Sequence, residues 1–255
     1  MLPSFPPEIL DLIVDNLHNE TSTLESCCLV SKSWVPRVRR ILFAPVKFST
    51  CRSPIQLWVK AFPDPRNSPA HHTRSLYFVY RDSITVASTV APAWVRRFCK
   101  IRKLRMINTR DPLAPGPPVP LVQLCGLSST LKSLRLVSLS TSISEVLDFI
   151  CSFPLLEDLS LHYVTTQGDP DGRYTPTTSP RLTGSLHMID RSSSLTRGLL
   201  GLPNGLHFSR VTTWCPVKSS NLPEVDLISK CSDTLEYLKT AFHSPSSFSL
   251  YLHGR

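Results

Sequence analysis

Apolar residues recur at helical spacing in the first stretch of the chain. Pro6 and Pro7 stand where a helix is expected to begin, because the first N–H groups of a helix lack an intrahelical partner. One apolar face follows, made of Ile9, Leu10, Ile13, Val14 and Leu17. A polar break at 19–22 precedes a second helix that Thr23 could cap, and a third is expected from Ser33. The pattern predicts three short helices, which are too few to bury a complete core alone.

A different pattern begins at residue 46, where an apolar–x–apolar triplet returns at near-even intervals. Counted between first members, the intervals are 30, 28, 30, 25, 27, 25 and 27 residues. The triplets begin at Val46, Leu76, Leu104, Leu134, Leu159 and Leu186, and fainter ones with threonine in the third place begin at Val211 and Leu238. Side chains alternate across a strand, so each triplet indicates a short strand with a buried face. A period in this range is typical of proteins built from stacked repeats.

Helical spacing returns between the predicted strands, over 55–62, 93–99, 146–150 and 225–231. Ser142 and Glu145 have the spacing of a capping box ahead of the third of these stretches. The segment 109–120 is proline-rich and the segment 165–180 is polar and turn-forming, so both are predicted to be loops. The alternation predicts an α/β fold in which strands line the inner face of a curved stack and helices lie outside.

Composition narrows the classes of protein that fit this pattern. The chain has 255 residues, of which 41% are hydrophobic, and no apolar run approaches the length that spans a bilayer. No secretion leader is visible, and the eight cysteines show neither C-x-x-C nor zinc-finger spacing. We therefore expect reduced, mostly buried thiols and no metal or other cofactor. No nucleophile elbow, P-loop or H-E-x-x-H motif occurs, so we predict that the chain is not an enzyme.

The net charge is +9, and its meaning for function depends on where the basic side chains lie on the predicted strands. If Leu104 and Met106 point into the core, Lys103 and Arg105 point to the opposite, inner face. The predicted substrate-binding residues on that face are Lys103, Arg105, Arg135, His187, Arg210 and Lys239. One interpretation is a solvated face that keeps the sheet in solution. The other is a surface that recognises an acidic or phosphorylated protein segment. Nucleic acid is the less favoured ligand, because no stacking-aromatic motif accompanies the charge.

The predicted N-terminal helices resemble an F-box, most closely the short F-box at the head of many fungal proteins. The resemblance rests on Leu2-Pro3, Pro7-Glu8-Ile9-Leu10, Ile13, Leu17 and the run from Cys28 to Trp34. It covers residues 2–43, with one departure at Ser4-Phe5-Pro6, which delays the Pro-Glu-Ile element after Leu2-Pro3. The alternative is an ordinary helical cap on a stack of repeats.

The later units resemble leucine-rich repeats. Two copies carry the L-x-x-L-x-L spacing of that family, at Leu131, Leu134, Leu136 and at Leu156, Leu159, Leu161. Leu139 and Val164 stand where the family usually has asparagine or cysteine, so the repeats are irregular. No polar capping repeat is evident after Leu238, as expected of a truncated or unusually short family member. The predicted organisation is a three-helix F-box over 1–45, followed by an irregular leucine-rich-repeat-like α/β solenoid over 46–255.

Together these resemblances imply a substrate-recognition subunit of a Skp–cullin–F-box ubiquitin ligase. In that family the F-box binds the Skp adaptor through apolar contacts, the adaptor leads to a cullin–RING ligase, and the repeats hold the substrate. Such a protein is expected in the cytoplasm or nucleus, with no membrane partner. The adaptor-binding residues carried over are Leu2, Pro3, Pro7, Glu8, Ile9, Leu10, Ile13, Leu29, Val30 and Trp34. The alternative is an F-box and repeat protein that acts as an interaction scaffold without joining a ligase.

Overall fold

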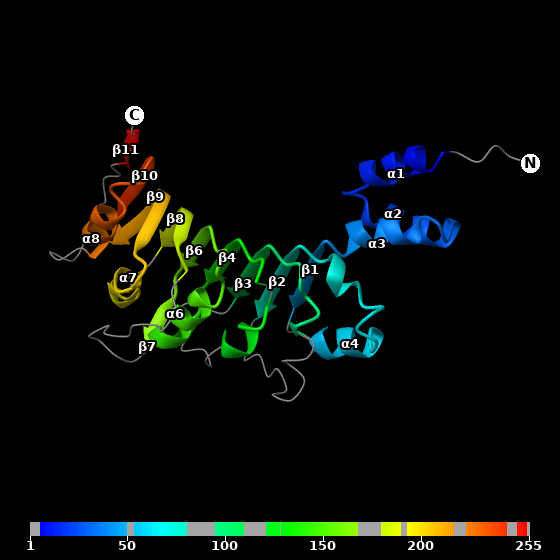
Figure 1. Ribbon diagram of the computed structural model, residues 1–255, viewed down its shortest axis with the longest axis horizontal. Coiled ribbons are helices and arrows are strands. Elements are labelled where there is room, and N and C mark those ends of the chain that lie inside the picture. The colour runs from blue at the N-terminus through cyan, green and yellow to red at the C-terminus, as the bar shows by residue number, and fades with distance from the viewer. Residues whose placement is uncertain are drawn as a thin grey trace, which may run out of the picture.

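The chain folds into three N-terminal helices followed by one long sheet with helices on one side (Figure 1). The helices are α1 (Pro7–Asn16), α2 (Thr21–Val30) and α3 (Val35–Leu42). The first eight strands of the sheet are all parallel, so the protein is of the α/β class. The computed structural model describes residues 6–49, 54–80, 95–109, 121–127, 129–167, 180–189, 193–216, 223–243 and 249–253.

The parallel strands lie side by side in the sheet in the same order as in the chain. They are β1 (Pro45–Ser49), β2 (Ser75–Tyr80), β3 (Lys103–Asn108), β4 (Ser133–Val137), β6 (Asp158–His162), β8 (Leu182–Ile189), β9 (Leu206–Pro216) and β10 (Tyr237–His243). A final strand, β11 (Ser249–His253), pairs antiparallel with β10. Every predicted triplet lies in one of the parallel strands. Their first members are register partners across the whole sheet, from Val46 to Leu238.

The connections carry helices over one face of the sheet, as Figure 1 shows. They are α4 (Pro54–Ala61), α6 (Ile143–Cys151), α7 (Ser193–Leu200), α8 (Pro223–Lys230) and the short 3-10 helices η2 (Pro69–His72) and η3 (Leu121–Leu124). The predicted cap of α6 is confirmed, because Ser142 Oγ accepts a hydrogen bond from the Glu145 N–H at 3.2 Å. The helix expected over 93–99 begins outside the described residues.

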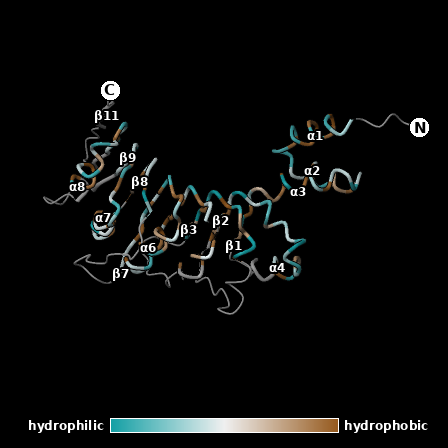
Figure 2. Tube along the Cα trace, viewed as in Figure 1, coloured by the Kyte–Doolittle hydropathy of each residue, from teal (hydrophilic) through white to brown (hydrophobic). Residues whose placement is uncertain are grey.

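Two separate hydrophobic clusters hold the protein together. The larger lies between the sheet and its helices, where the triplet leucines Leu76, Leu104 and Leu134 are at most 1% exposed. The smaller lies among α1, α2 and α3 and consists of Val14, Leu24, Cys27 and Val38. Hydrophobic residues occur along each of these three helices (Figure 2). The N-terminal helices therefore have a small core of their own.

Several local expectations are corrected. Thr165–Gln167 is not a loop but strand β7, which pairs in parallel with β5 (Ser140–Ser142), because the Thr165 N–H donates to the Leu139 carbonyl at 2.8 Å. Thr23 is not a cap, since α2 already begins at Thr21. Helix α7 was not predicted. The remainder of the two expected loops, at 110–120 and 168–179, lies outside the described residues.

Candidate functional site

The N-terminal helices leave large apolar side chains uncovered. Leu29 is 90% exposed, Val30 72% and Leu12 58%, and Ile9 and Ile13 are also exposed. We call these residues the uncovered apolar set. Its α1 members stand at i, i+3 and i+4 and so share one face of the helix. Exposed apolar surface of this density on a small unit is typical of a protein-binding site.

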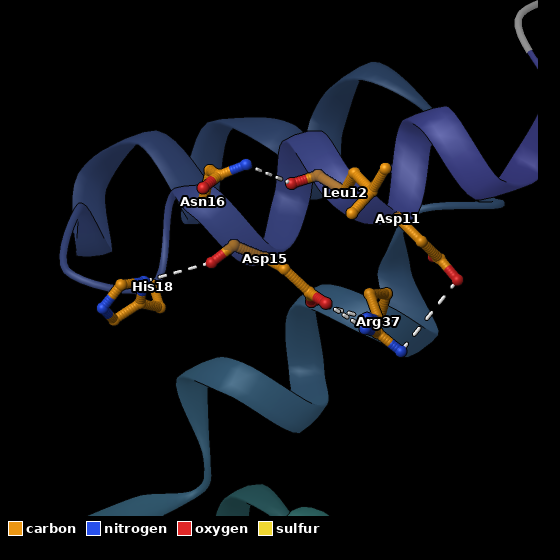
Figure 3. Close-up of polar contacts among 6 residues, drawn as sticks. All are labelled: Asp11, Leu12, Asp15, Asn16, His18 and Arg37. Carbon is orange, nitrogen blue, oxygen red and sulfur yellow. Dashed lines mark hydrogen bonds and ion pairs between the residues drawn. The ribbon is translucent and has the colours of Figure 1, made fainter.

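An ion-pair network joins α3 to α1 (Figure 3). Arg37 Nε donates to Asp15 Oδ1 at 2.7 Å, and Arg37 Nη2 donates to Asp15 Oδ2 in a second, very short contact. A longer contact of 4.0 Å joins Arg37 to Asp11. The hydrogen bond from Arg37 lowers the pKa of Asp15 below its usual value. The ion pair joins α1 to α3, and because both side chains are partly exposed it adds little to the stability of the helical unit.

The predicted adaptor-binding residues do not all occupy equivalent positions. Pro7, Glu8, Ile9, Ile13, Leu29 and Val30 are exposed. Leu10 is half-buried, and Trp34 is half-buried against the core of the helical unit, so Trp34 contributes to the fold itself. Leu2 and Pro3 lie outside the described residues. Leu12 was missed, although its place one helical turn after Ile9 was visible in the sequence.

The sheet face opposite the helices carries a continuous row of mostly polar and cationic side chains. Register partners in adjacent strands stand about 4.8 Å apart, so they form one line across the sheet. We call this line the central row. It consists of Lys47, Tyr77, Arg105, Arg135, Ser160, His187, Thr212 and Lys239. Four of the six predicted substrate-binding residues belong to it: Arg105, Arg135, His187 and Lys239.

Arg105 and Arg135 are register neighbours on β3 and β4 and are the strongest chemical feature of the central row. Within the described part of the chain neither has a carboxylate partner, and the Nε atoms of both are buried without an acceptor. Burial and the charge of Arg105 lower the pKa of Arg135 below its usual value. Two adjacent guanidinium groups without an anion present donors for a carboxylate or phosphate.

A histidine pair continues this surface toward β8. His162 Nε2 lies 2.6 Å from His187 Nδ1 and 2.9 Å from Ser160 Oγ, and the two rings are 4.7 Å apart. Burial, then His187 and the two arginines, lowers the pKa of His162 to about 4. Burial, Arg135 and Lys239 lower the pKa of His187. Both rings are therefore neutral at pH 7 and share one hydrogen bond.

The other two predicted substrate-binding residues lie on the same face but in a neighbouring row. Lys103 and Arg210 align with Asp158, where Ser185 Oγ donates to the carboxylate at 2.5 Å. Lys103, Asp158 and Arg210 are exposed. This row is mixed in charge, whereas the central row contains the adjacent Arg105 and Arg135, which have no carboxylate partner among the described residues.

Comparisons with known proteins give no assignment: no protein-family model matches the sequence, and no curated protein is detectably similar to it. Among the helices that the structure describes, none combines the length and apolar character needed to cross a bilayer. In the same residues, no group of three or more histidine, cysteine, aspartate or glutamate side chains is placed to hold a metal ion. The uncovered apolar set and the central row are the two candidate functional surfaces described above.

Proposed function

We propose that this chain is a substrate-recognition subunit of a Skp–cullin–F-box ubiquitin ligase. In this proposal the N-terminal helices are an F-box that binds a Skp-type adaptor, and the sheet is the inner face of a leucine-rich-repeat-like solenoid that holds a protein substrate. The mechanism is proximity: the protein makes no bond itself, but keeps a substrate lysine near a ubiquitin-charged enzyme. The expected compartment is the cytoplasm or the nucleus.

The observation that carries the proposal is the uncovered apolar set on a helical unit with a very small core. Leu29 and Val30 are the two most exposed large hydrophobic side chains among the described residues. Each such side chain that is buried against a partner would contribute about 1.5 to 3 kcal/mol to the free energy of binding. A few apolar anchors of this kind usually dominate the energy of an interface.

A regular main-chain pattern supports the solenoid. The Arg74 carbonyl accepts hydrogen bonds from the N–H groups of Arg102 and Lys103, and the Arg102 carbonyl accepts from Lys132 and Ser133 in the next unit. The Lys132 carbonyl repeats the arrangement with the unit after that. The units up to β6 therefore contact their neighbours through the same bonds, as expected for stacked repeats.

The experiment is co-purification of the full chain with a Skp-type adaptor, comparing wild type with Leu29→Asp. Leu29 makes almost no contact within the chain, so this variant should fold normally yet lose at least about tenfold in adaptor affinity. The matched control is Leu57→Asp, which changes a leucine that is 60% exposed on α4, far along the chain.

Each outcome has a meaning. Adaptor and cullin together in the wild-type sample, with loss only in Leu29→Asp, support the ligase subunit. Adaptor without cullin favours an F-box scaffold that does not join a ligase. Adaptor binding by Leu29→Asp that equals that of Leu57→Asp contradicts the proposed F-box interface. Absence of adaptor binding by wild type also contradicts it.

A further inference from the structure

The open sheet face carries a third row, which the sequence did not reveal. It lies two residues beyond the central row, toward the carboxyl ends of the strands. We call its aliphatic members the aliphatic row: Val79, Ile107, Val137 and Ile189, on β2, β3, β4 and β8, with His162 on β6 standing between Val137 and Ile189. All four are half-buried, and none belongs to the hydrophobic cluster between the sheet and its helices. They therefore face the same side as the arginines.

On β3 and β4, a cationic side chain of the central row is followed two residues later by an aliphatic side chain of the aliphatic row. Arg105 precedes Ile107 by two residues on β3, and Arg135 precedes Val137 by two residues on β4. Two residues of strand span about 6.6 Å, which is the distance between the rows. Side chains two residues apart on an extended peptide are separated by the same distance and point to the same side.

We propose that this face recognises an extended protein segment in which an acidic side chain and an aliphatic side chain stand two residues apart. The acidic group occupies the place between Arg105 and Arg135, and the aliphatic group lies on Ile107 and Val137. The inference rests on the substrate-recognition role proposed above and adds the sequence feature that the substrate carries.

Charge and burial together select this occupant. Neither the Arg105 nor the Arg135 guanidinium has a carboxylate partner within the described residues, and both residues are only half-buried, so a bound carboxylate would supply an acceptor that they lack. Ile107 and Val137 lie directly beside the two arginines. A ligand that carries only an anion would leave these two aliphatic side chains facing water. A segment with both groups in that spacing satisfies both rows at once.

The test measures binding of fluorescein-labelled peptides to the full chain by fluorescence anisotropy. The probe is a short serine–glycine peptide with one glutamate and one valine two residues apart. A second peptide places the same two residues adjacent, so that their side chains point to opposite sides of an extended chain. A third keeps the glutamate and replaces the valine with serine. The first peptide should bind about tenfold more tightly than either of the others.

Variants of the protein assign the two contributions. Val137→Ser should remove the preference for the first peptide while leaving binding of the glutamate-only peptide unchanged. Arg105→Gln/Arg135→Gln should weaken all acidic peptides at least about tenfold. Leu155→Ser is the matched control, because Leu155 is 53% exposed between α6 and β6 and away from both rows. Circular dichroism confirms that each variant is folded.

Several results would overturn the inference. Equal binding of the three peptides leaves acidic recognition standing but removes the aliphatic row from it. Binding of none removes the proposed substrate surface as well, while the adaptor experiment still stands on its own. A preference for the first peptide that survives in Val137→Ser places the aliphatic contact elsewhere. Concentration-dependent self-association abolished by Val137→Ser would show that a second copy of the chain occupies this row instead.

Discussion

His162 is a buried titratable side chain beside two arginines on an otherwise open sheet face. It is 8% exposed, and its hydrogen bond to His187 requires one ring to donate and the other to accept. Protonating His162 would add a charge next to Arg105 and Arg135, and protonating both rings would leave two N–H donors facing each other. Its lowered pKa is the electrostatic consequence of these neighbours and of burial.

We predict that the free energy of unfolding falls as the pH is lowered from 7 to 5. The folded-state pKa of His162, about 4, lies below the ordinary value of 6.5, so in this window the unfolded chain takes up a proton that the folded chain does not. Between pH 7 and pH 5 the free energy of unfolding falls by about 1 to 2 kcal/mol. The fall continues below pH 5 and ends near the folded-state pKa. Urea unfolding at the two pH values measures it.

The control for this prediction is the variant His162→Gln, which should flatten the pH dependence. An unchanged slope in His162→Gln would contradict the assignment of the effect to this pair.

At the scale of elements, β8 shows how one glycine allows a strand to change register. The pairing of β8 with β9 shifts between Gly184 and Ser185. Gly184 has a φ of +77°, and a Cβ added there would lie 2.7 Å from the Glu157 carbonyl oxygen. The backbone at this point therefore needs both the left-handed conformation and the missing side chain.

We predict that Gly184→Ala lowers the free energy of unfolding by about 2 to 4 kcal/mol, from backbone strain plus a clash with main chain. Gly205 is the matched control, because its φ is also positive, at +68°, but the nearest atom to an added Cβ is 3.8 Å away. Gly205→Ala should cost only the strain, about 1 to 2 kcal/mol. Urea denaturation of both variants measures the difference. Equal losses would mean that the close approach to Glu157 contributes nothing.

Most elements could be predicted from the sequence because their causes are local. The period of two around Leu104 and Leu134 places Arg105 and Arg135 on the opposite face whatever the rest of the chain does. The rows could not be predicted in full, since which residues align depends on pairing between strands. Lys103 and Arg210 were thus grouped with Arg105, and the contact of His162 with His187 was not foreseen. Parallel pairing of β5 with β7 depends on a main-chain bond between distant residues, which no local pattern records.

At the scale of the whole molecule, the two hydrophobic clusters differ in size, so local stability differs along the protein. The cluster around Val14, Leu24 and Val38 is small, whereas the sheet cluster runs from β1 to α8. Small cores are less stable because they bury less apolar area for each ordered residue. The helices that carry the uncovered apolar set are therefore the less stable part of the protein.

We predict that backbone amides in α1, α2 and α3 exchange with solvent deuterium faster than those of β3, β4 and β6. Val38→Ala, which truncates a fully buried side chain, should lower protection in the three helices by about 1 to 3 kcal/mol and leave the central strands unchanged. Leu134→Ala is the converse control and should affect the sheet. Uniform loss of protection in Val38→Ala would show that the two clusters unfold as one unit.

The turns after β4 and β6 carry a consequence for how this protein can vary. Ser138 and Tyr163 both have a positive φ, of 54° and 53°, and their N–H groups donate to the His162 and Ile189 carbonyls of the next strand. Serine and tyrosine share little chemistry, so the likeness between these corners resides in torsion angles and not in side chains. A family of proteins built this way can change most of its amino-acid sequence while the fold persists. Common ancestry would then still be recognisable from the structure after it can no longer be recognised from the sequence.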